Sequence, residues 1–157
     1  MRLAAVVLVL ALPAFLVSKA ADKKCISPTP MDDPKFHAGQ VWQYKTRPGE
    51  EDSFVTILRV ESLGKKTIIH VRVDKVRLKN CAGGPEPDTI EHMPFAREAI
   101  ESSVTKLLKE DSKIPDFRAG YDDWRNACGG VYTISIAEAV KADQLTFNQN
   151  LGCASNP

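Results

Sequence analysis

The chain has 157 residues, of which 43% are hydrophobic and 26% are charged, and its formal net charge is +1. This balance of 21 basic and 20 acidic residues argues against a nucleic-acid-binding protein, which normally presents a basic surface. It also argues against adhesion to an anionic membrane through charge alone. Because a chain of this length suits a single hydrophobic core, we expect one domain.

The amino terminus, residues 1–20, has the pattern of a secretory signal peptide. Met1-Arg2 supplies a positive charge, residues 3–17 are almost wholly apolar, and Ser18-Lys19-Ala20 places small residues before a cleavage site. The apolar run is shorter than the roughly 20 residues that cross a bilayer. We therefore expect cleavage after Ala20, no membrane insertion of the mature protein, and a periplasmic or secreted location.

Residues 21–37 are rich in proline and charge and show no apolar period. This composition predicts an extended amino-terminal arm that is tied down at Cys25. The remaining residues, 38–157, would form the single domain.

Three strands are predicted after the arm. Alternation begins at Trp42 and Tyr44, Phe54–Glu61 is rich in β-branched residues, and Lys66–Lys79 alternates again. The apolar phase slips at Asp74-Lys75, which predicts a bulge or bend. The connections between the strands are short, so we expect an antiparallel meander.

Helical spacing follows the strands. The apolar stripe over residues 94–108 predicts a helix with Pro94 in its first turn, and a second helix begins near Asp116 and ends at Gly129-Gly130. After a brief strand at 131–134, Ser135 and Glu138 fit a capping box for a last helix. The predicted fold class is α+β, an antiparallel β-meander packed against two or three helices in a single small domain.

Four cysteines remain after cleavage: Cys25, Cys81, Cys128 and Cys153. An even number in an exported chain predicts disulfides, and four cysteines allow three pairings. We favour Cys25–Cys81 and Cys128–Cys153, because the second pair brackets one predicted helix. The cysteines and histidines lack the short spacing of zinc ligands, so we expect no metal site and no cofactor.

The segment WQYKTRPGEEDSFVTI, residues 42–57, contains a charged turn. Pro48 presets φ for a turn and Gly49 accepts a positive φ, so a solvated hairpin turn is the favoured interpretation. The alternative is a recognition tip made by Arg47, Glu50 and Glu51. Under both interpretations these three side chains would project into water.

Two histidines are the candidates for catalysis. His70 shares a predicted strand face with Arg72 and Asp74, and such a trio could orient a proton-transfer imidazole. His92 lies just before the predicted helix at 94–108. An exposed polar strand face is the favoured interpretation for His70, and it makes His70 and Arg72 candidate binding residues.

Five short blocks between residues 36 and 140 carry a family resemblance: GQVWQYKTRPGEEDS, IIHVRVDKV, HMPF, GYDDWR and GVYTISIAEAV. Their ordered set resembles a family of small uncharacterised bacterial proteins. The resemblance implies one compact α+β domain, and it implies no activity, cofactor or catalytic residue.

Three hypotheses for the function remain open. The favoured one is an exported binding or inhibitor protein with a protein partner, for example an immunity protein against a toxin that targets the cell envelope. The second is a small envelope hydrolase that uses His70 or His92 with Glu50 or Asp74. The third is a structural envelope component. Because no complete catalytic motif is found, the sequence favours a non-enzymatic role.

Overall fold

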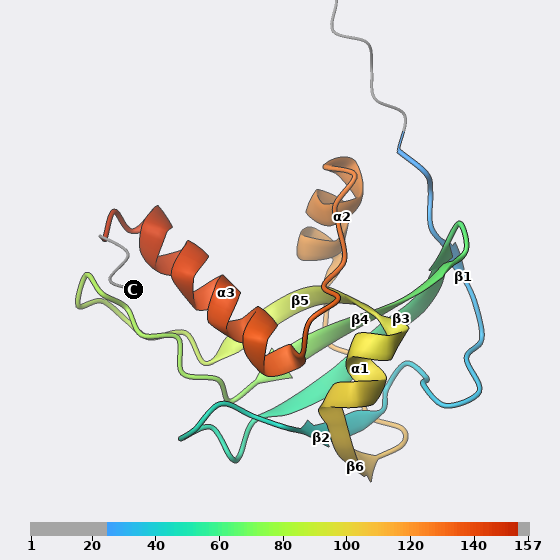
Figure 1. The fold of residues 1–157 in the computed structure, drawn as a ribbon, viewed down its shortest axis with the longest axis horizontal. Helices are drawn as coiled ribbons and strands as arrows, with labels where there is room; N and C mark the ends of the chain where they lie inside the picture. Colours follow the sequence, from blue (N-terminus) through green and yellow to red (C-terminus); the bar gives the residue numbers. More distant parts are fainter. Residues whose placement is uncertain (1–24, 154–157) are drawn as a thin grey trace, which may run out of the picture.

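The computed structural model describes residues 25–153, so the expected signal peptide lies outside the described residues. Within them the chain forms a six-stranded antiparallel sheet and three helices (Figure 1). The predicted α+β class and single small domain are confirmed.

The strands are β1 (Thr29–Pro30), β2 (Val41–Tyr44), β3 (Phe54–Leu63), β4 (Lys66–Asp74), β5 (Thr89–Ala96) and β6 (Val104–Lys109). The order across the sheet is β5-β4-β3-β2-β6. β1 also pairs with β3, through Thr29 opposite Ser62. The predicted meander corresponds to β2, β3 and β4, which are joined by the short connections expected from the sequence.

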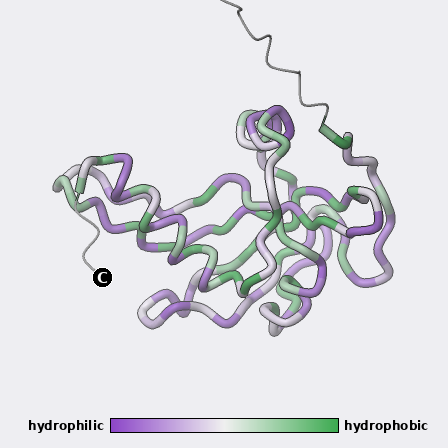
Figure 2. Tube along the Cα trace, turned by 45° about the horizontal axis from the view of Figure 1, so that its top comes forward, coloured by the Kyte–Doolittle hydropathy of each residue, from purple (hydrophilic) through white to green (hydrophobic). Residues whose placement is uncertain are grey.

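One face of the sheet carries the main hydrophobic core. Helices α1 (Arg97–Ser103) and α3 (Ile136–Asn150) cover this face, and their Ile100 and Val140 join Ile69 and Val71 of β4 in one buried cluster. The alternation of apolar and polar residues produces this arrangement, and Figure 2 shows the two kinds interleaved along the strands and α3. The predicted capping box is confirmed, because Ser135 and Glu138 bond reciprocally at the start of α3.

The phase slip at Asp74-Lys75 is also confirmed. Lys75 adopts a positive φ of 58°, and β4 ends at Asp74. Beyond this bend Val76 and Leu78 are buried, whereas the alternate residue Arg77 is exposed. The segment therefore continues as extended chain with its apolar side turned toward the core.

The predicted helix over 94–108 is wrong at both ends. Residues up to Ala96 belong to β5, α1 spans only Arg97–Ser103, and the chain from Val104 forms β6. Pro94 cannot donate to a ladder, and β5 tolerates it because this strand lies at the edge of the sheet. β6 forms because it pairs with β2, an interaction that local sequence does not report.

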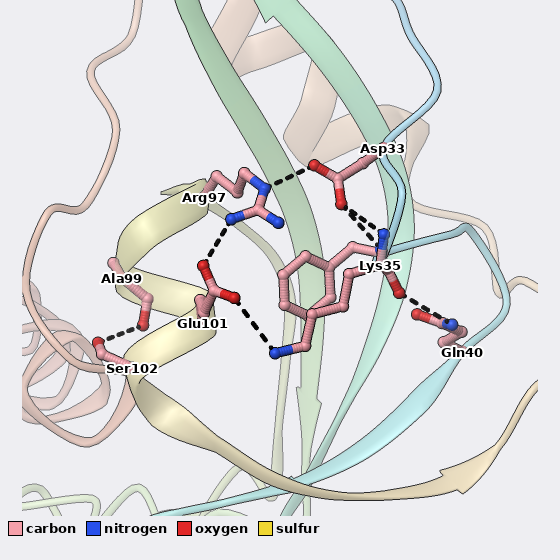
Figure 3. A network of polar contacts seen from close by, with 8 residues as sticks. Asp33, Lys35, Gln40, Arg97, Ala99, Glu101 and Ser102 are labelled. Carbon is pink, nitrogen blue, oxygen red and sulfur yellow. Dashed lines mark hydrogen bonds and ion pairs between the residues drawn. The ribbon is translucent and has the colours of Figure 1, made fainter.

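The amino-terminal arm is fixed to the domain by ionic contacts (Figure 3). Arg97 at the start of α1 forms an ion pair of 2.6 Å with the buried Asp33 of the arm, and it also pairs with Glu101 one turn later. Lys35 pairs with the same Glu101 at 3.3 Å. The arm is therefore held beside α1 as well as by β1.

The disulfide pairing differs from the favoured one. The bonds are Cys25–Cys128 and Cys81–Cys153. The first joins the arm to the residue just after α2 (Arg118–Asn126), and the second joins the loop between β4 and β5 to the end of α3. The favoured pairs joined cysteines that are closer in the sequence. They are wrong because the fold places the ends of α2 and α3 beside segments that are distant in the chain. Two disulfides are consistent with an exported protein.

Across residues 25–153, none of the helices combines the length and the apolar character that crossing a membrane requires.

Candidate functional site

A buried polar cluster lies on the second face of the sheet, opposite the main core. The pairing of β3 with β4 sets Arg59 across from His70 and Glu61 across from Ile68. Side chains directly opposite, or two residues apart on one strand, share a face. Arg59, Glu61 and His70 therefore meet, and His92 of β5 joins them from the other side. With Tyr121 of α2, these residues form what we call the histidine cluster.

The two histidines are hydrogen-bonded to each other. Nδ1 of His70 lies 2.9 Å from Nε2 of His92, and the rings stack with centroids 5.1 Å apart. Such a bond requires one ring to donate and the other to accept, so both rings cannot be protonated together. Nε2 of His70 lies 3.2 Å from the Glu61 carboxylate. This favours the tautomer with hydrogen on Nε2 of His70, which leaves His92 as the donor in the pair.

Glu61 is completely buried and is contacted by the polar groups of Tyr121 and Arg59. The Tyr121 hydroxyl donates to its two oxygens, at 3.0 and 2.9 Å, and Arg59 forms an ion pair with it at 2.6 Å. Burial, followed by the hydrogen bond to Glu61, raises the pKa of Tyr121, so the phenol remains a donor. The carboxylate is therefore compensated within the cluster.

Burial also keeps both histidines neutral. It lowers the pKa of His70 to about 3, assisted by the neighbouring His92 and Arg59, and it lowers the pKa of His92 to about 4. Glu61 would favour a charged His70, but the contact between them lacks the geometry of a hydrogen bond. Because Arg59 and Tyr121 already balance Glu61, we assign neutral rings to both histidines at neutral pH.

Helix α2 closes the cluster. Trp124 packs edge-on against His70 with ring centroids 4.8 Å apart, and Tyr121 does so at 5.3 Å. Gly120 permits this close approach, since a Cβ there would lie 2.9 Å from the Cβ of His92. His70 is consequently 0% exposed. The prediction of His70 on an exposed strand face is wrong, because α2 covers that face.

The predicted trio of His70, Arg72 and Asp74 does not form. Arg72 donates to Asp74 at 2.7 Å, and Asp74 also accepts from Thr89. Glu50, the other carboxylate considered for a hydrolase, bonds Arg47 and lies outside the histidine cluster. The two candidate histidines are thus brought together, but with Glu61 instead of either expected acid.

The charged turn between β2 and β3 is not a set of free side chains. Glu50 is only 4% exposed and accepts from the Arg47 guanidinium and from the Arg77 backbone N–H. Burial acts to raise the pKa of Glu50, but these two hydrogen bonds outweigh it and the pKa is lowered. Pro48-Gly49 form the turn as predicted, and Glu51 is exposed. The prediction that all three charged side chains project into water is wrong for Glu50, and Arg47 is half-buried.

A pocket of about 360 Å³ lies beside the histidine cluster, between the arm and α2. We call it the arm–α2 pocket, and it is lined by Cys25, Ile26, Pro28, Leu63, Trp124, Arg125, Cys128 and Gly129. Trp124 separates the pocket from His70, and its indole N–H is held by the Gly130 carbonyl at 2.8 Å. Ile26 at the rim is 71% exposed. The Cys25–Cys128 disulfide fixes one wall.

Among residues 25–153, no group of three or more His, Cys, Asp or Glu side chains is arranged to bind a metal ion. Comparisons with protein-family models, with curated proteins and with solved structures found no match.

Sequence reasoning missed Glu61, Tyr121 and Trp124 as partners of the histidines. Arg59 and Glu61 were available as a signal, since they interrupt an apolar strand at alternate positions. Because the β3–β4 turn is short, it sets the register of the two strands, and this register places Arg59 opposite His70. The docking of α2 had no comparable local signal.

Proposed function

We propose that the protein is an exported binding protein that holds a protein partner at the arm–α2 pocket. The observation that carries the proposal is the contrast between two neighbouring features. His70 and Glu61 are fully buried beneath α2, whereas the pocket beside them is open and its rim exposes Ile26. The fully buried His70 cannot reach a substrate, but an open apolar concavity with a rigid wall can accept a side chain.

The exposed rim favours a protein over a small molecule as the occupant. A small ligand that filled the pocket would cover only the part of Ile26 that lines it, whereas a protein segment that inserts an apolar side chain would also cover the exposed rim. Arg125 at the edge already pairs with Asp122 at 3.1 Å. The contact we propose is therefore mainly apolar, with Trp124 as its anchor.

Inhibition is the form of binding that we propose. The pocket walls come from the arm, the β3–β4 turn and α2, and the Cys25–Cys128 bond joins the first to the last. A surface fixed in this way loses little conformational freedom on binding, which favours a tight complex. An immunity protein that blocks a toxin of the cell envelope would need such a surface.

A pull-down from periplasmic extract tests the proposal. The wild type should retain a specific protein, and Ile26→Asp should lose it. Ile114→Asp is the matched control, because Ile114 is an exposed isoleucine outside the pocket. The captured protein is then identified and its stoichiometric complex rebuilt from purified components. Equal capture by both variants, or turnover by the isolated chain that depends on His70, would overturn the proposal.

A further inference from the structure

A second concave surface is lined by no residue of α2. It is a groove of about 520 Å³ between the β2–β3 turn, the chain after β4 and helix α3. In Figure 1 the end of α3 and the loop between β4 and β5 lie side by side there. Four cations line it: Arg47, Arg77, Lys79 and Lys141. We call this surface the basic groove.

Most of this positive charge is unpaired. Glu50 is the single acid that lines the groove. Its carboxylate already accepts hydrogen bonds from the Arg47 guanidinium and from the Arg77 backbone N–H. Within residues 25–153, the side chains of Arg77, Lys79 and Lys141 form no ion pair. Glu50 and the exposed Glu51 both interact electrostatically with Arg77 without an ion pair. Three cations from two separate elements therefore face a shared space in a chain of nearly neutral charge.

The fold holds the backbone of these cations in place. The buried Leu78 points into the core, so its neighbours Arg77 and Lys79 both point outward. The Gln144 side chain of α3 accepts from the Lys79 N–H at 2.7 Å and donates to its carbonyl at 2.8 Å. The Cys81–Cys153 disulfide then closes the same two segments covalently. The backbone of Lys79 and helix α3, which carries Lys141, are thus fixed relative to each other before any ligand arrives.

We propose that the basic groove binds a phosphate group, carried either by a free phosphate compound or by a lipid headgroup. A phosphate offers several charged oxygens around one centre, which suits a groove lined by an arginine and two lysines from two segments of the chain. A lone carboxylate would be satisfied by one of them. The groove shares no lining residue with the arm–α2 pocket, so the inference does not depend on the proposed partner.

The experiment uses the mature chain with three probes. Pyrophosphate binding is measured by calorimetry, and co-sedimentation is measured with phosphatidylglycerol vesicles and with phosphatidylcholine vesicles. The groove variant is Lys79→Glu/Lys141→Glu, and the matched control is Lys66→Glu/Lys106→Glu, whose lysines are exposed outside the groove. Thermal melts verify that both variants remain folded.

Wild type and control should bind pyrophosphate or phosphatidylglycerol vesicles, and the groove variant should bind at least about tenfold more weakly. Binding of pyrophosphate identifies a free compound as the source, and binding confined to phosphatidylglycerol identifies a headgroup. The affinity should fall as ionic strength rises, since the cations are exposed. Equal binding by the groove variant, equal sedimentation with phosphatidylcholine, or no binding of any probe to the wild type would overturn the inference.

Discussion

His70 and His92 share a hydrogen bond of 2.9 Å beneath α2, and the two rings cannot both carry a second proton without breaking it. This pair sits on the sheet face opposite the main core, where an alternating strand would ordinarily meet water. The protein therefore has two covered sheet faces, and the second is covered by one short helix. Stability on that face should respond to pH, to the packing of α2 and to the disulfide that holds it.

Acid should destabilise the protein through this histidine pair. In the unfolded chain both rings titrate near the ordinary pKa of 6.5, whereas burial lowers the folded values to about 3 and about 4. Below pH 6.5 the unfolded state binds more protons, so the stabilisation present above 6.5 is lost as pH falls toward the folded values. Urea unfolding at pH 7 and pH 5 should differ by about 2 kcal/mol per histidine.

Two variants check the assignment of this effect. His92→Gln should reduce the pH dependence, since one of the two titrating rings is removed. His37→Gln should leave it unchanged, because His37 is exposed. Stability that rises between pH 7 and pH 5 would show instead that Glu61 holds a charged His70.

Glu50 should contribute to folding in spite of its place in a charged turn. Glu50→Ala leaves the Arg77 N–H without its acceptor and removes the two bonds that the Arg47 guanidinium donates to this carboxylate, at a cost of about 1–3 kcal/mol. Glu51→Gln is the matched control, because this neighbouring side chain is exposed and glutamine keeps an acceptor for the Gly49 N–H, and its effect should stay within about 0.5 kcal/mol. Chemical denaturation measures both, and equal stability of the two variants would contradict the buried position of Glu50.

Gly120→Ala should destabilise the domain. Alanine in place of glycine inside a helix normally gains up to about 1 kcal/mol, but here the new Cβ would lie 2.9 Å from the Cβ of His92. The steric cost of overpacking, about 1–3 kcal/mol, should reverse the sign. Gly130→Ala is the control, since nothing lies within 4 Å of its Cβ. A stabilised Gly120→Ala protein would mean that α2 does not pack on His92.

The disulfide pairing can be read directly by mass spectrometry of peptides from non-reduced protein. We expect peptides that join Cys25 to Cys128 and Cys81 to Cys153. Cys25→Ser/Cys128→Ser should lower the free energy of unfolding by several kcal/mol, roughly 2–5, because the bond closes a long loop. A peptide that joins Cys128 to Cys153 would contradict the docking of both helices described above.

The sequence predicted those elements whose signal is local. Alternation defined β2, β3 and β4, the phase slip located the bend at Lys75, and the Ser135–Glu138 pair located the start of α3. β6 was missed because Val104 and the leucines after it also fit a helical stripe that begins at Pro94. Only the pairing with β2, more than fifty residues earlier in the chain, decides that this segment is a strand and not the end of a helix.

The site was predicted in part for the same reason. His70 and His92 were recognised as unusual residues, but their partners depend on strand register and on where α2 docks. Alternation cannot distinguish a polar face in water from one that a helix covers. Glu50 was misjudged in the same way, because its burial depends on Arg77, which lies on a different segment of the chain.

The central claim is that a protein partner binds at the arm–α2 pocket, and the dissociation constant of the purified complex tests it most directly. Leu63 lines the pocket at the β3–β4 turn, whereas Leu108 is an exposed leucine on β6. Calorimetry should show that Leu63→Asp weakens the complex by at least about a hundredfold, the effect of losing a buried contact of roughly 3 kcal/mol. Leu108→Asp should bind like the wild type. Unchanged affinity for a folded Leu63→Asp protein would contradict the claim.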